Sequence, residues 1–145
     1  IALGIKTQSN FGDKDQNFLA AMGEAGSVRG WRYPRHSNYN DPDQIYRFGF
    51  HNLKSTVELR KVVVPRFPLQ DLYEFGITVG TFIDWGVTSQ MEFSDMFGMR
   101  PVIGTGITVQ LQMPFVSVLR LDYGYGFYDG KQIDRAFHLA VGHQI

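Results

Sequence analysis

Residues 73–87 read YEFGITVGTFIDWGV, and two kinds of side chain alternate along this stretch. The odd positions are apolar or aromatic except for Thr81, and the even positions are small or polar except for Phe82. A period of two residues predicts an extended strand rather than a helix. The stretch is 15 residues long, whereas a usual strand has about 5 to 6. This pattern is typical of a transmembrane β-barrel strand, which has lipid on one side and a hydrated lumen on the other.

The same alternation recurs in other segments, which we predict to be strands at residues 1–6, 53–64, 103–113, 119–127 and 137–145. The connections alternate in length, with long ones at residues 9–50, 88–101 and 128–134 and short ones at residues 65–72 and 114–117. Outer-membrane barrels have short periplasmic turns and longer extracellular loops, so we expect an antiparallel meander with residues 9–50 outside the cell. A soluble sandwich or lipocalin-like barrel would share the period with its apolar faces turned inward, but it has no reason to alternate its loop lengths.

Composition excludes several classes of protein. The 145 residues carry no formal net charge and include no cysteine. Balanced charge argues against a nucleic-acid surface, and the lack of cysteine rules out disulfides and thiolate zinc sites. The sequence has no run of about 18 apolar residues of the kind that forms a transmembrane helix.

The predicted strands are too few to close a membrane barrel. Single-chain bacterial barrels begin at about 8 strands, and an open sheet in lipid would leave backbone groups unpaired. The sequence also opens at Ile1 within a predicted strand. We therefore expect upstream strands or a second chain to complete the wall.

Two motifs give this framework a family resemblance. Val28-Arg29-Gly30-Trp31 resembles the Val/Ile-Arg-Gly-Phe/Tyr motif of the BamA and TamA superfamily of outer-membrane assembly and translocation proteins, with Trp31 in place of the usual Phe or Tyr. The motif Phe-x-Asp-x-Gly, found on a later strand of that family, is matched by Phe82, Asp84 and Gly86.

Two further motifs agree in order and spacing. The strand at residues 53–64 carries Glu58 where the family has a glutamate-bearing strand. The closing segment is similar to the family's C-terminal strand signature, except that Ile145 replaces the usual terminal aromatic residue. In this chain the signature corresponds to Phe137, Leu139, Val141, Gly142 and Ile145.

The resemblance implies an all-β fold, namely the last six strands of a sixteen-strand antiparallel transmembrane β-barrel, with residues 9–50 as an extracellular loop folded into the lumen. It implies a place in the outer membrane of a Gram-negative bacterium or an endosymbiont-derived organelle. The implied function is insertion or translocation of other β-barrel proteins without covalent catalysis. The implied partners are the lipid bilayer, the missing barrel strands, client outer-membrane proteins, and periplasmic domains or lipoproteins. A pore that secretes one dedicated polypeptide and a membrane anchor for a fused lipase-like enzyme remain alternatives.

The motif residues also suggest a specific contact. Glu58 and Asp84 fall on the lumen side of adjacent strands, where two like charges would repel each other and raise each other's pKa. A guanidinium can serve two carboxylates because it is planar and stays charged, so Arg29 is the candidate partner. The alternative is that Arg29 is one solvated charge in a basic loop. The resemblance favours a contact between loop and barrel wall formed by Val28, Arg29, Gly30, Trp31, Glu58, Phe82, Asp84 and Gly86.

Other polar residues show no chemistry of their own. The four histidines lack the spacing of metal ligands, and Ser27 and Ser37 lack a paired base and acid. We therefore expect no metal, no cofactor and no catalytic residue. Gly104 and Gly106 lie on the lumen side of a strand, where they would leave room in the lumen. Arg120 and Asp122 share that side, and we expect them to pair with neighbours across the sheet.

Overall fold

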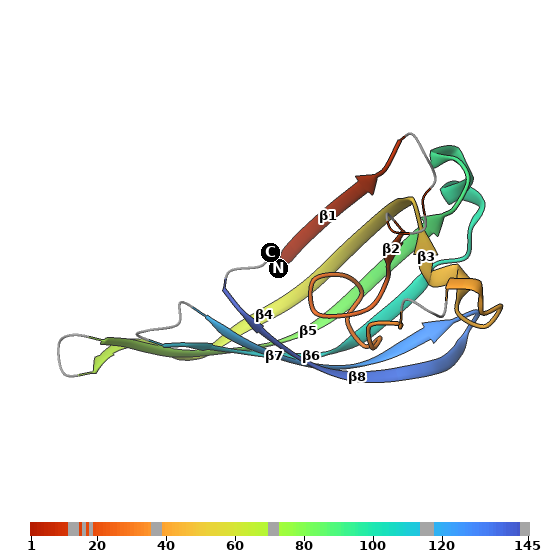
Figure 1. Cartoon of the computed structure of the whole chain (residues 1–145). Coiled ribbons are helices and arrows are strands. Elements are labelled where there is room, and N and C mark those ends of the chain that lie inside the picture. The colour runs from red at the N-terminus through yellow and green to blue at the C-terminus, as the bar shows by residue number, and fades with distance from the viewer. Residues whose placement is uncertain are drawn as a thin grey trace.

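A single antiparallel sheet of six long strands dominates the chain (Figure 1). The computed structural model describes residues 1–11, 15, 17, 19–35, 39–69, 73–113 and 118–142. The strands of the sheet are, in spatial order, β1 (Ala2–Ser9), β4 (His51–Leu69), β5 (Tyr73–Ser89), β6 (Val102–Gln112), β7 (Leu119–Tyr128) and β8 (Lys131–Val141). All five neighbouring pairs are antiparallel. The predicted all-β, antiparallel class is confirmed.

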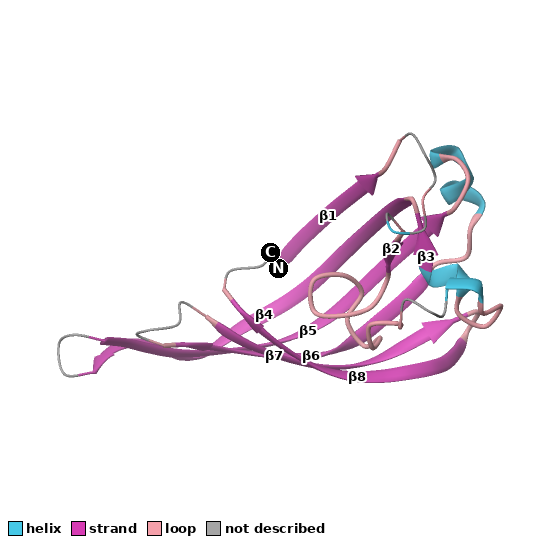
Figure 2. Cartoon of the chain, viewed as in Figure 1, coloured by secondary structure: helices cyan, strands magenta, loops and turns pink. Residues whose placement is uncertain are grey.

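The sheet is a curved wall and is not closed on itself. Its two edges within the described residues are β1 and β8, and the strands bend around the segment that follows β1 (Figure 1). That segment carries a second, two-stranded sheet, formed by β2 (Ala20–Ala21) and β3 (Phe48–Gly49). Two short 3-10 helices, η3 (Ile45–Arg47) and η4 (Phe93–Gly98), lie in the connections (Figure 2).

The last hairpin corrects the sequence prediction. Residues 128–134 were expected to form a long loop, but β7 and β8 are joined by the two residues Asp129 and Gly130, with φ of 49° and 73°. Asp-Gly with positive φ at both positions is the type I′ turn that suits the twist of a hairpin. The alternation of long and short connections therefore fails at this turn.

The turn also moves the closing strand. We predicted a strand over residues 137–145, whereas β8 begins at Lys131 and ends at Val141. Gly142 follows with a φ of 103°, a left-handed value that other residues rarely adopt. Ile145 lies outside the described residues, as do the predicted short turn at 114–117 and residues 70–72 of the other short turn.

The two faces of the wall are the reverse of those in a soluble sheet. We call the face on which residues 20–35 and 39–49 pack the covered face and the opposite one the bare face. The covered face carries buried polar groups, such as Asp84 and Asp122, which are 2% and 0% exposed. The bare face carries large apolar side chains, and Ile83, Ile107 and Phe137 are 57%, 55% and 64% exposed. The alternation read from the sequence is present, with its apolar side uncovered in this chain.

Candidate functional site

Glycines form the floor on which residues 28–31 rest. They lie on the covered face of three adjacent strands, at Gly86, Gly104, Gly106, Gly124 and Gly126. A Cβ at Gly104 would lie 1.7 Å from the carbonyl oxygen of Arg29, and one at Gly126 would lie 2.6 Å from the Trp31 ring. The loop therefore fills the room left by Gly86, Gly104 and Gly126, while the Phe82 ring lies over Gly106 and Gly124.

Gly30 is needed at the point of closest approach. Its φ is 89°, and a Cβ there would lie 2.6 Å from the carbonyl oxygen of Tyr125. Val28, two residues before Gly30, is fully buried. It fills the space above Gly86, where a Cβ would meet the Val28 side chain at 2.8 Å. The Val28–Trp31 motif of the loop and the Phe82–Gly86 motif of β5 therefore have complementary shapes.

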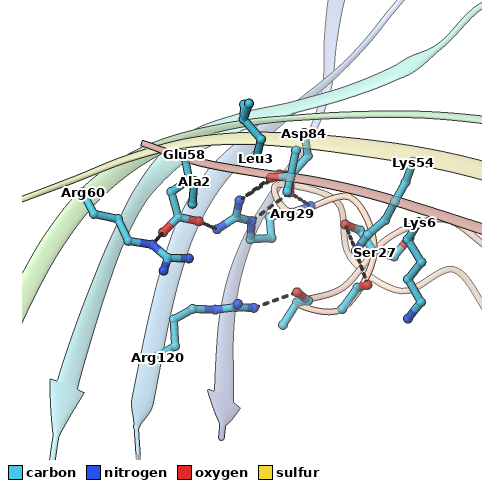
Figure 3. A pocket seen from close by; sticks show the side chains of 13 residues that line it. Ala2, Leu3, Lys6, Ser27, Arg29, Lys54, Glu58, Arg60, Asp84 and Arg120 are labelled. Carbon is cyan, nitrogen blue, oxygen red and sulfur yellow. Dashed lines mark hydrogen bonds and ion pairs between the residues drawn. The ribbon is translucent and has the colours of Figure 1, made fainter. Parts of the chain in front are cut away.

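The Arg29 guanidinium lies between the carboxylates of Asp84 and Glu58 (Figure 3). Its Nε and Nη2 atoms donate to the two oxygens of Asp84, each at 2.8 Å, and Nη1 donates to Glu58 Oε2 at 2.8 Å. The Arg29 backbone N–H also donates to Asp84, at 2.9 Å. Thr56 Oγ1 accepts a further bond from Nη2 at 3.0 Å. Side chain and backbone of one loop residue are thus fixed to two adjacent strands.

The cluster is buried and balanced in charge. Asp122 lies 3.5 Å from Arg29, and the Phe82 ring lies 3.7 Å beneath the guanidinium carbon. Three carboxylates face three guanidiniums, because Arg60 donates to Glu58 at 2.5 Å and Arg120 to Asp122 at 2.8 Å. The acidic and basic members are Glu58, Asp84, Asp122, Arg29, Arg60 and Arg120. This balance offsets the large cost of burying each charge.

The pKa of Arg29 reflects this environment. Burial alone would lower the pKa of the guanidinium, but hydrogen bonds and charges from Asp84, Asp122 and Glu58 hold it above its ordinary value. Arg29 is therefore a permanent cation. We call the set of bonds that Arg29 forms with Asp84 and Glu58 the clasp, because it holds the loop against the wall.

Trp31 anchors the other end of the motif. It is 1% exposed, its Nε1 donates to the carbonyl of Ile103 at 2.8 Å, and it packs with Val28, Met22 and Val102. The guanidinium of Arg47 lies over the ring at 4.8 Å, a cation–π geometry. The indole N–H thus fixes residue 31 to the wall by a hydrogen bond.

Sequence reasoning missed part of the cluster. Arg120 and Asp122 were expected to pair across the sheet, but they pair with each other along β7, and Arg120 also donates to the carbonyl of Ala25 at 2.7 Å. Thr56 was not singled out, although it stands directly opposite Asp84 in the register of β4 and β5. The sequence did carry a signal for this cluster, because the charged residues that β4, β5 and β7 contribute to it occupy alternate positions that face the same side of the sheet.

The C-terminal residues of the predicted site lie apart from the clasp. Phe137, Leu139 and Val141 are on the bare face of β8, each at least 60% exposed. The Gly142 backbone N–H donates to the carbonyl of Val118 at 2.9 Å, just past the end of the strand. These residues therefore form part of the wall's apolar surface and have no contact with the Arg29 cluster.

Comparison with models of protein families, with curated proteins and with solved structures found no match. The family resemblance of the motifs stays a prediction. In the part of the chain that the structure describes, no helix is long and apolar enough to cross a membrane. Among the same residues, no group of three or more histidine and acidic side chains is arranged so that it could hold a metal ion.

Proposed function

We propose that this chain forms the last six strands of a sixteen-strand outer-membrane β-barrel of the BamA and TamA type, which assists the assembly or transport of other β-barrel proteins. The observation that carries the proposal is the uncovered apolar face opposite a covered polar face. A soluble protein rarely exposes a large contiguous apolar surface, whereas a barrel in lipid requires one. In this reading the bare face meets lipid and the covered face lines the lumen.

The clasp supports the proposed role in assembly or transport. A segment fixed by buried ion pairs inside a lumen blocks or shapes the path through it. The edge of β8 supports it as well. An exposed strand edge offers unpaired N–H and C=O groups to an incoming strand, and β8 has a partner on one side only within the described residues.

Ile107→Arg tests the contact with lipid. Ile107 is 55% exposed at the centre of β6, so in a soluble protein its replacement would change stability by less than about 0.5 kcal/mol. Near the middle of a bilayer, the same change should lower the free energy of unfolding by about 2 to 4 kcal/mol. The measurement is urea unfolding of the complete protein folded into lipid vesicles.

Gln110→Arg is the matched control on the same strand. Gln110 lies on the covered face, partly exposed, with its amide 3.4 Å from Glu58 Oε1. An added cation there remains hydrated and near a carboxylate, so the cost should be below about 1 kcal/mol. Equal tolerance of both substitutions would mean that the bare face does not lie in hydrocarbon.

A disulfide across the edge of β8 tests the function. The chain contains no cysteine, so Ala140→Cys can be combined with one cysteine in the strand that closes the barrel against β8. We expect the oxidised protein, reconstituted in vesicles, to lose most of its ability to insert an unfolded β-barrel client, and reduction of the same sample to restore it. Unchanged insertion by the oxidised protein would contradict strand templating at β8. Inactivity in both states would favour a secretion pore or an anchor.

A further inference from the structure

Arg47 is a buried cation without a carboxylate partner. Its side chain is 4% exposed. Its guanidinium donates to the carbonyl of Met22 at 2.8 and 3.0 Å, to Gln44 Oε1 at 2.8 Å and to the carbonyl of Arg32. All of these acceptors are neutral, and no acidic side chain of the described residues lies within ion-pair distance of it. Buried charges are normally paired, so this arrangement calls for an explanation.

Further positive charge surrounds Arg47. It lines an open cavity of about 450 Å³ together with Arg32 and Arg35, both exposed, and with Gln44 and Tyr33. Asp134 is the one acidic side chain among the described residues of the lining, and it is held by Arg32, whose Nε and backbone N–H donate to its two oxygens at 2.9 and 3.0 Å. The described residues of the lining thus contribute three cations and one anion, an excess of two positive charges.

The pKa of Arg47 is consistent with an uncompensated charge. Burial lowers it, and the neighbouring Arg32 lowers it further, while Tyr46 and Asp134 only partly oppose these effects. Asp134 acts on Arg47 without a direct bond, because its two oxygens accept from Arg32. An anion entering the cavity would supply the missing charge.

We propose that this cavity is a binding site for a phosphoryl group. Guanidinium groups form strong, charge-assisted hydrogen bonds to phosphate oxygens, and among the described residues Nη1 of Arg47 donates only to Gln44, which leaves its second N–H for a ligand. Arg35 supplies an exposed cation at the entrance, and the Tyr33 and Gln44 side chains add hydrogen-bonding groups. The site lies on the same end of the sheet as the turn between β7 and β8, because Asp134 near the start of β8 forms part of it.

The ligand would act on the clasp through Trp31. The Arg47 guanidinium stacks on Trp31, and its bonds to the carbonyls of Met22 and Arg32 tie together the two ends of the segment that contains Arg29. A phosphoryl group that stabilises Arg47 in this position would also stabilise the seated loop. The inference goes beyond the proposed function and does not depend on it, because binding requires only the folded cavity.

Calorimetric titration of the complete protein in detergent with inorganic phosphate, against chloride at equal ionic strength, tests the site. Arg35→Gln should weaken phosphate binding about tenfold, the equivalent of one charge-assisted hydrogen bond, without affecting the fold. Arg47→Lys keeps the charge but has fewer N–H donors, too few to hold the acceptors of Met22, Arg32 and Gln44 and also bind a ligand, so it should weaken binding at least as much. Arg100→Gln removes an exposed arginine that does not line the cavity and is paired with Asp129 in the turn between β7 and β8. This variant should leave binding unchanged.

Two probes distinguish the source of the phosphoryl group. Detergent micelles that contain a phospholipid with a phosphomonoester headgroup are compared with micelles that contain an uncharged lipid, each in competition with inorganic phosphate. Displacement of phosphate by the phosphorylated lipid alone identifies a headgroup as a ligand, and its failure to compete assigns the site to free phosphate. The proposal is overturned if phosphate binds no better than chloride, or if Arg100→Gln weakens binding as much as Arg35→Gln.

Discussion

Replacing Arg29 with alanine should lower the free energy of unfolding by about 3 to 5 kcal/mol, because it leaves buried carboxylates without their cation. The guanidinium makes two bonds to Asp84 and one to Glu58, all at 2.8 Å. The remaining cations, Arg60 and Arg120, are directed at other oxygens. The repulsion between the uncovered carboxylates should then release the loop from the sheet. Chemical denaturation measures the loss, and amide hydrogen exchange over residues 23–31 should rise with it.

The geometry of the guanidinium makes a second variant informative. Arg29→Lys keeps one positive charge, but an ammonium cannot form the paired bonds to Asp84 and reach Glu58 at the same time. Its stability should fall between that of the native protein and that of Arg29→Ala. Arg100→Ala is the control, since this arginine is 65% exposed in its side chain and a surface ion pair contributes at most about 1 kcal/mol. Equal losses in Arg29→Ala and Arg100→Ala would contradict a buried clasp.

A double-mutant cycle separates the ion pair from loop packing. In the Arg29→Ala background, Asp84→Asn removes a charge that no longer has a partner, so its cost should be smaller than in the native protein. A coupling energy of about 1 to 3 kcal/mol is expected for side chains in direct contact. Additive effects would mean that Arg29 acts on stability by a route other than Asp84.

Much of the site could be predicted because strands impose a period of two on their side chains. Glu58 and Asp84 lie on the same face of the sheet because each occupies an alternate position, opposite the apolar side chains of its own predicted strand. The loop residue Arg29 could not be placed in this way, because the period of two does not say where a loop residue lies on the sheet. Its selection from among the loop arginines depended on the resemblance of the motif.

The period of two does not give the register between strands, and this explains what was missed. Parity places Asp122 and Asp84 on one face, but only pairing shows how close each lies to Arg29. The turn at Asp129 and Gly130 is a different case, because Asp-Gly is a strong hairpin signal in any sequence. Lys131 and Gln132 follow it with no apolar alternation, so the first part of β8 resembled a loop. The start of β8 is therefore determined by the residues of the turn and not by the hydrophobic pattern.

Gly104→Ala should disrupt the site as severely as loss of Arg29, through sterics alone. The new Cβ would lie 1.7 Å from the carbonyl oxygen of Arg29 and 3.1 Å from the Val28 side chain. The close contact is with backbone, so no rotamer change can relieve it. Neither backbone can yield easily, because β6 is paired with a strand on both sides and Arg29 is held by hydrogen bonds from its own N–H and guanidinium.

The loop should therefore lift from β6 and take the Arg29 bonds with it, at a cost of about 3 kcal/mol or more, the upper end of the usual range for overpacking. Gly98→Ala is the matched control, because a Cβ there meets nothing within 4 Å, and it should be neutral. Denaturation and hydrogen exchange over residues 23–31 measure both variants. If Gly104→Ala acts by displacing the loop, it should cost little more in the Arg29→Ala background, where the loop is already released. A full additional loss in that background would place the damage in the sheet itself rather than in the seating of the loop.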